Sequence, residues 1–151
     1  MPAPATGEGK RTMKNVKAII DLFGGLASFR HVRLECAGFM PLIVEAVGPG
    51  PRSLPMVSVA HYYSQNGDAM RDPELVFEVD AAGTFHPVSF QQDNLGLYHE
   101  AVFVDDAGRV MVRPRLVKDL ASFARQWDKN LKAQGFVDAA RAEAQRRAAA
   151  G

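Results

Sequence analysis

The densest run of side chains that could do chemistry lies between positions 61 and 74, with the sequence HYYSQNGDAMRDPE. It holds an imidazole, two phenols, several carboxylates and a guanidinium, and its Asn-Gly pair is typical of a tight turn. Functional side chains are common on loops that rigid strands hold in place. The run predicts a binding surface made of His61, Tyr63, Gln65, Asn66, Asp68, Arg71 and Asp72. The alternative is a purely structural turn, in which the guanidinium pairs with a neighbouring acid.

A second polar stretch, HPVSFQQD at positions 86–93, adds Gln91, Gln92 and Asp93 to this surface. Successive residues of a strand point to opposite faces, so the two glutamines lie on different sides. If the strands are neighbours, one of the glutamines approaches His61 or Tyr63. Two adjacent glutamines in an aromatic strand suit hydrogen bonding to a partner. An exposed sheet face with no partner explains the same residues equally well.

These residues suggest one catalytic arrangement. His61 would act as a general base with Asp68 or Asp72, or the three would hold a divalent ion, in a hydrolase or nuclease-like reaction. That chemistry requires the groups to converge in one cleft. The sequence has no zincin histidine spacing, nucleophile elbow, phosphate loop or dinucleotide fingerprint. We therefore expect no metal and no cofactor, and a binding protein is favoured over an enzyme.

The charge balance and the cysteine content argue against two further classes, nucleic-acid binders and disulfide-bonded proteins. The chain has 151 residues with 18 Lys plus Arg and 17 Asp plus Glu, so it lacks the basic excess of most nucleic-acid binders. A nucleic-acid-associated protein stays a third hypothesis because basic residues gather toward the C-terminus, namely Arg125, Lys129, Lys132, Arg141, Arg146 and Arg147. The single cysteine, Cys36, cannot form a disulfide within the chain and is expected on the apolar side of a strand.

Hydrophobic periodicity predicts the elements that position these residues. An apolar stripe at helical spacing predicts a helix that Thr12 caps and Gly24-Gly25 ends. Alternating or β-branched segments then predict strands at 31–36, 42–47, 56–63, 74–79, 85–92, 97–104 and 109–112. Two Asp-x-x-Gly connections, at 80–83 and 105–108, are short enough to force antiparallel hairpins.

The C-terminal part of the chain is predicted to be helical. Pro114 suits a first helical position, and the stripe that follows consists of Leu116, Leu120, Phe123, Trp127 and Leu131. Asp128 and Lys132 are expected to form an exposed pair one turn apart. Gly135 ends this helix, and residues 136–150 predict a last, weakly anchored helix.

These elements predict an α+β fold with an N-terminal helix, an antiparallel meander of about five to seven strands, and C-terminal helices packed on one face. The chain divides into a flexible tail at 1–11, a single domain at 12–135, and an Ala/Arg-rich helix or tail at 136–151. The absence of a signal-peptide pattern and of a long apolar run makes the cytoplasm the expected compartment. The predicted core consists of Ile19, Phe23, Val57, Val59, Phe77, Leu116, Leu120, Phe123 and Trp127.

The polar run at 61–74, together with VFE at 76–78, PVSFQQD at 87–93 and GLY at 96–98, resembles a family of uncharacterised bacterial proteins. The resemblance covers the chain from Met13 to Gly135. It implies a domain of unknown function carried by integrative conjugative elements, plasmids and prophages, and it supplies no catalytic residues. We therefore expect an accessory protein that engages a protein partner, whose identity stays open. Nucleic acid is not favoured, no membrane partner is expected, and the oligomeric state stays open.

Overall fold

A computed structural model describes residues 12–151, so the predicted tail at 1–11 lies outside the described residues. The described chain begins with helix α2 (Lys14–Leu22) and ends with helices α3 (Pro114–Ala133) and α4 (Phe136–Ala150). Between them lie β1 (His31–Leu34), β2 (Leu42–Pro49), β3 (Pro55–Gln65), β4 (Asp68–Val79), β5 (Phe85–Gln92), the short helix η1 (Asp93–Leu95), β6 (Leu97–Glu100), β7 (Val102–Val104) and β8 (Val110–Val112).

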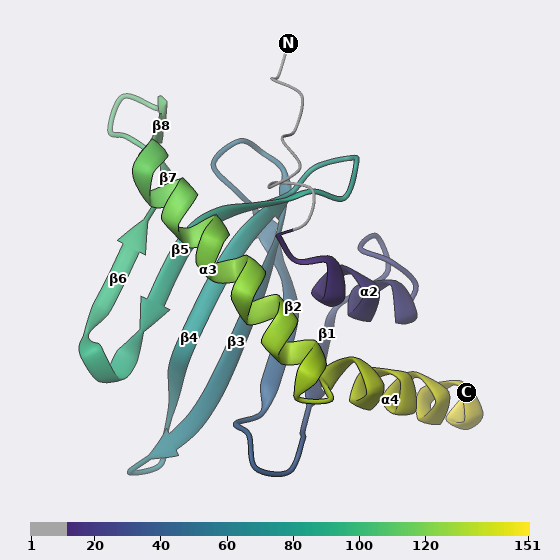
Figure 1. Ribbon diagram of the computed structural model, residues 1–151. Coiled ribbons are helices and arrows are strands. Elements are labelled where there is room, and N and C mark those ends of the chain that lie inside the picture. The colour runs from purple at the N-terminus through teal and green to yellow at the C-terminus, as the bar shows by residue number, and fades with distance from the viewer. Residues whose placement is uncertain (1–11) are drawn as a thin grey trace.

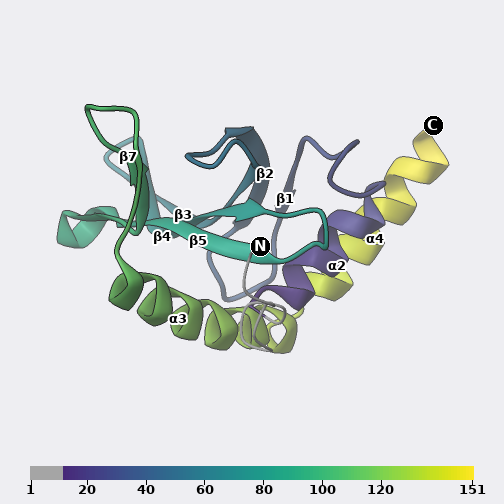
Figure 2. The same cartoon turned by 90° about the horizontal axis from the view of Figure 1, so that it is seen from above.

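The strands form an antiparallel meander, which confirms the predicted α+β fold. Six strands pair in the order β1-β2-β3-β4-β5-β6, and β7 and β8 pair as a separate hairpin. The helices cover one face of the large sheet (Figure 1). Seen from above, the hairpin containing β7 rises on the side opposite α3, and β2 curls up at the other side of the same face (Figure 2). Within residues 12–151, no helix covers this second face, which we call the helix-free face, and it is bounded on two sides.

The polar run at 61–74 is an arm of two paired strands rather than a loop. β3 and β4 pair as far as Gln65 and Asp68, and the turn between them is Asn66-Gly67, whose φ angles of 53° and 87° suit these residue types. Pairing shifts between Ala60 and Tyr62 because Pro73 has no N–H to donate to the ladder. The predicted strand 97–104 is also divided, because the chain leaves the sheet after β6 to build the hairpin β7–β8.

The main core lies between the sheet and the helices. It holds Val16 and Ile19 of α2, Phe77 of β4, Trp127 of α3 and Phe136 of α4. The prediction that Phe123 belongs to the core is wrong. Phe123 is 42% exposed, because it lies on the flank of α3 and covers the rings of Phe90 and Trp127 at 5.7 and 6.1 Å rather than entering the interior. Phe23 and Leu116 are only partly buried.

Asp128 does not form the predicted exposed pair with Lys132. Its side chain is 1% exposed, and its two carboxylate oxygens accept the backbone N–H groups of Asn15 at 2.9 Å and Val16 at 3.0 Å. The N-cap residue of helix α2 is Met13, which makes no side-chain capping bond, so a residue of α3 supplies the cap. Burial raises the pKa of the Asp128 carboxyl, and the two backbone bonds oppose that rise.

Helix α4 is anchored at its start and solvated at its end. Phe136, Val137 and Ala140 are buried against the core, following Gly135, which adopts a left-handed conformation. The basic residues of the exposed half are paired, since Arg141 binds Asp138, and Glu143 binds both Arg146 and Arg147. These two arginines lower the pKa of Glu143 to about 2. Within residues 12–151, no helix combines the length and the apolar character needed to cross a membrane.

Candidate functional site

The predicted surface residues are divided between the two faces of the sheet. His61 faces the helices, where its ring lies 5.6 Å from the rings of Trp127 and of Phe136, and it is 7% exposed. Its Nδ1 lies 3.1 Å from the carbonyl oxygen of Met40 and 3.3 Å from that of Pro41. Since carbonyl oxygens only accept, Nδ1 carries the hydrogen. The imidazole is thus a packed and hydrogen-bonded core residue.

Burial lowers the pKa of His61, although the two carbonyl contacts and the charge of Asp72 act against that shift. Because the unfolded chain then binds the proton more readily, the contribution of His61 to stability is complete above its unfolded pKa near 6.5 and is lost as the pH falls through the lower folded value. We expect urea unfolding at pH 7.5 and 5.5 to show this loss in the wild type. In His61→Phe the loss should be smaller, whereas His99→Gln, at an exposed position of β6, should keep the wild-type response. Equal pH dependence in all three proteins would contradict the assignment.

Among the described residues, no hydrogen bond or ion pair joins His61 to Asp68 or Asp72. Asp68 begins β4 at the exposed end of the arm, next to Gln65 and Asn66. Asp72 accepts a bond of 2.7 Å from Nε2 of Gln92. Tyr63 is half-buried on the arm and pairs with Met70. Among the described residues, no group of three or more His, Cys, Asp or Glu side chains is arranged to hold a metal ion.

Three predicted residues do come together on the helix-free face. Asp93 accepts the backbone N–H of Arg71 at 2.8 Å, the Nε of Arg71 at 3.1 Å, and the Nε2 of Gln91 at 2.9 Å. The backbone bond from Arg71 leads the interactions that lower the pKa of Asp93. Nη1 of Arg71 also lies 3.6 Å from a carboxylate oxygen of Glu74. This cluster ties the start of β4 to the end of β5.

Beside the cluster, the helix-free face is hollowed into a cavity of about 430 Å³, which we call the trough. Strands β3, β4 and β5 form its floor, the β7 strand forms one side, and the end of β2 with the following loop forms the other (Figure 2). The floor residues are Met56, Ser58, Glu74, Val76, Val88 and Ser89. The sides and mouth are formed by Val47, Pro49, Gly50, Pro51, Tyr98, Glu100, Val102, Phe103 and Val104.

Among the described residues, those that line the trough and carry a charge are the acidic Glu74 and Glu100. The hydroxyl of Ser58 donates to Glu74 at 2.5 Å, and the hydroxyl of Tyr98 donates to Glu100 at 3.3 Å. The pKa of Tyr98 is raised, first by burial and then by the charges of Glu100 and Glu74. The phenol therefore lies in the field of both carboxylates, and the trough combines apolar sides with a negative potential.

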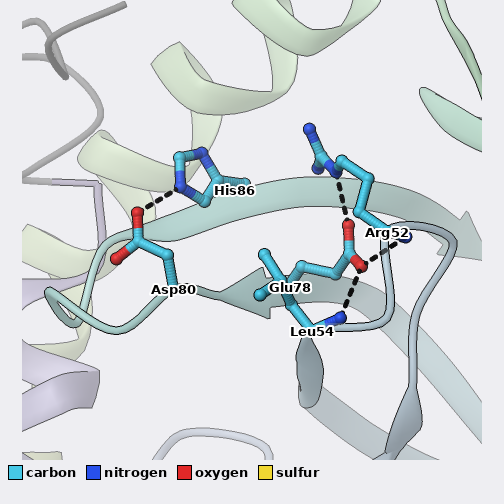
Figure 3. Close-up of polar contacts among 5 residues, drawn as sticks. All are labelled: Arg52, Leu54, Glu78, Asp80 and His86. Atoms are coloured by element: carbon cyan, nitrogen blue, oxygen red, sulfur yellow. Dashed lines mark hydrogen bonds and ion pairs between the residues drawn. The ribbon is translucent and has the colours of Figure 1, made fainter. Parts of the chain in front are cut away.

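A buried carboxylate fixes the loop at one end of the trough. Glu78 is 0% exposed and accepts the backbone N–H of Arg52 at 2.8 Å, the Nε of Arg52 at 2.7 Å and the backbone N–H of Leu54 at 3.3 Å (Figure 3). Gly50 is required where the loop crosses Glu78, because a Cβ there would lie 2.6 Å from the Cγ of that side chain. The loop that carries Pro51 into the trough wall is thus held by specific bonds.

The turn that follows β4 is closed by a second acid. Asp80 accepts the backbone N–H groups of Ala82 at 2.9 Å and Thr84 at 3.0 Å, and it lies 2.8 Å from Nε2 of His86 (Figure 3). Burial opposes ionisation of Asp80, but the bonds from His86 and Thr84 outweigh it and lower its pKa. The Asp-x-x-Gly pattern of the sequence therefore has a direct structural role at this end of β4 and β5.

Sequence reasoning missed the residues that give the trough its chemistry, namely Ser58, Ser89, Tyr98 and Glu100, and it read Glu74 only as the end of a polar run. Polar residues between apolar neighbours in predicted strands are a usable signal, since a period of two places them on one face. The register that pairs Glu74 with Gln91, and Gln91 with Tyr98, was needed to bring them together.

A family model described as a domain of unknown function (DUF6908) matches residues 14–137. The matched segment runs from the start of α2 to the beginning of α4 and includes every strand of the described sheet. Comparison with curated proteins and with solved structures finds no match for the chain.

Proposed function

The chain belongs to the family described as a domain of unknown function (DUF6908), and from this premise we propose that it is a non-enzymatic binding module whose trough receives a segment of a partner protein. The observation that carries the proposal is the open cavity of about 430 Å³ on the helix-free face, which falls in the size range of ligand sites. It offers apolar sides for side-chain burial and hydroxyls and carboxylates for orientation, which is the composition of a recognition surface.

The biological setting of the proposal comes from the resemblance carried by the polar run at 61–74. We place the protein in the cytoplasm as an accessory protein of a bacterial mobile genetic element, with its partner encoded by that element or by the host. The arm is the continuation of β3 and β4 beyond Ser58 and Glu74, which line the trough, and it extends the surface that a partner can cover. Tyr62 and Tyr63 of the arm border a smaller hollow with Arg33.

Filling the trough tests this function. Val76 lies partly exposed on the floor, so Val76→Trp should occupy the space without disturbing the core. Tagged protein would be used to capture partners from nuclease-treated host lysate, with quantification by mass spectrometry. We expect the wild type to retain a stoichiometric protein that Val76→Trp loses by about tenfold or more, which corresponds to about 1.4 kcal/mol.

The matched control is Leu22→Trp, which adds the same ring at an exposed position at the end of α2. It should capture the partner as the wild type does, and both variants should unfold at the wild-type temperature. A double variant, Tyr63→Ala/Arg71→Ala, tests whether the arm also contributes to capture of the partner. Equal capture by the wild type and a folded Val76→Trp variant would show that the trough is not the binding site.

A further inference from the structure

Resting on the proposed binding function, we propose that the trough selects a segment that carries a lysine or arginine side chain among apolar residues, and that Glu74, Tyr98 and Glu100 receive the cationic group. The ligand class is therefore a basic and apolar peptide segment of a partner. The proposal follows from where these three side chains lie, from what neutralises them, and from the residues around them.

The three side chains belong to one face of neighbouring strands. Glu74 pairs with Gln91 across β4 and β5, and Gln91 pairs with Tyr98 across β5 and β6. Glu100 pairs with Ser89, two residues along β5 from Gln91, and so points to the same face. Strands two apart in a sheet are separated by about 10 Å, and both glutamates line the same trough.

The charges on this face do not cancel. Arg71 is the base nearest to Glu74, but its closer contacts are with Asp93, at 2.8 and 3.1 Å, against 3.6 Å to Glu74. Arg113 lies beside Glu100, but its Nη1 donates to the backbone carbonyl oxygen of Glu100 at 2.6 Å, and its guanidinium lies 4.3 Å from the centre of the Phe103 ring. Three carboxylates, those of Glu74, Asp93 and Glu100, are therefore set against the two guanidinium groups of Arg71 and Arg113. The remaining partners of Glu74 and Glu100 are the neutral hydroxyls of Ser58 and Tyr98. A cation entering the trough meets an excess of negative charge, and an acidic segment is repelled.

The surroundings suit the rest of a basic side chain. Lysine and arginine bury an aliphatic stem while the charged end keeps polar partners. The floor beside the carboxylates offers Met56, Val76 and Val88, and the hairpin side offers Val102 and Val104, of which Val104 is exposed. Apolar neighbours in the partner segment would cover these side chains. Burial raises the pKa of Tyr98 most, and the charges of Glu100 and Glu74 add to that rise.

Selection from a random peptide library displayed on phage, with the full chain immobilised, tests the proposal. We expect the enriched peptides to share a lysine or arginine flanked by apolar residues. A synthetic copy of one enriched peptide would then be measured by fluorescence anisotropy, together with a copy whose basic residue is norleucine. The norleucine copy should bind about tenfold more weakly, and so should the original peptide to the double variant Glu74→Gln/Glu100→Gln.

The control double variant is Glu35→Gln/Asp119→Asn, which removes the same formal charge at exposed positions that do not line the trough. It should bind the peptide as the wild type does, and circular dichroism should show that both double variants are folded. Enriched peptides that Val76→Trp excludes but that lack a basic residue would overturn the charge inference and leave the proposed function standing. If no enriched peptide is excluded by Val76→Trp, the proposed function fails together with the inference.

Discussion

Replacing Asp128 with alanine is expected to lower the free energy of unfolding by about 2–4 kcal/mol. The carboxylate is buried, and it is the acceptor for the backbone N–H groups of Asn15 and Val16 at the start of α2. Without it, both donors lose their partner in a region that water does not reach, and the junction between α2 and α3 is weakened. Urea unfolding followed by circular dichroism measures the change.

Two further variants sharpen this test. Asp128→Asn keeps the shape of the side chain but has one acceptor oxygen where two are needed. Its free energy of unfolding should therefore fall between those of the wild type and the alanine variant. Lys132→Ala is the matched control, because Lys132 is exposed and should contribute only about 0.5 kcal/mol or less. Similar small losses for Asp128→Ala and Lys132→Ala would favour the exposed pair that the sequence suggests and contradict the buried cap.

Truncation of Phe77 to alanine is expected to cost about 3–5 kcal/mol, because it removes a fully buried ring from the centre of the core. Its ring lies 5.6 Å from that of Phe85, and its neighbours across β3 and β5 are Val57 and Pro87. Rigid strands on both sides limit how far the surroundings can collapse into the cavity. Chemical denaturation of the variant and of the wild type measures this loss in the free energy of unfolding.

Phe123→Ala provides the comparison, since the same truncation at a position that is 42% exposed should cost clearly less. The sequence placed Phe77 and Phe123 in one core, and the structure separates them. Equal losses in the two variants would mean that the flank of α3 is as closely packed as the centre of the sheet. That result would contradict the partly exposed position of Phe123.

The fold could be predicted from the sequence because its main signals are local. The period of the apolar stripes in α2 and α3 and the two Asp-x-x-Gly turns each depend on a few adjacent residues. The length of the β3–β4 arm was missed because its residues are mostly polar, and only pairing across the turn makes them strands. The cap from Asp128 was missed because it joins residues 113 positions apart.

The site was harder to predict because it depends on register. Alternation along β3 places His61 on the helix-covered face with the buried Val57 and Val59, whereas the extra residue on β4 shifts the register so that Tyr62 pairs with Arg71 on the arm. The polar run that looked like one surface is therefore divided between two environments. Arg71, Gln91 and Asp93 were singled out from their residue types, and the structure places all three in one hydrogen-bonded cluster. Tyr98 and Glu100 were not singled out, because only the turn at η1 brings β6, the strand that carries them, beside β5.

The bonds that Glu78 makes to the loop at 52–54 have a consequence for the kinetics of association. Because that wall is already held by three hydrogen bonds, a partner segment does not have to organise it, and little conformational entropy of the module is lost on binding. When the wall is preorganised in this way, the association rate is limited by diffusional encounter with the partner and not by rearrangement of the wall. For the proposed basic segment, we therefore expect the association rate to depend on long-range attraction to the carboxylates of the trough and to fall as ionic strength rises.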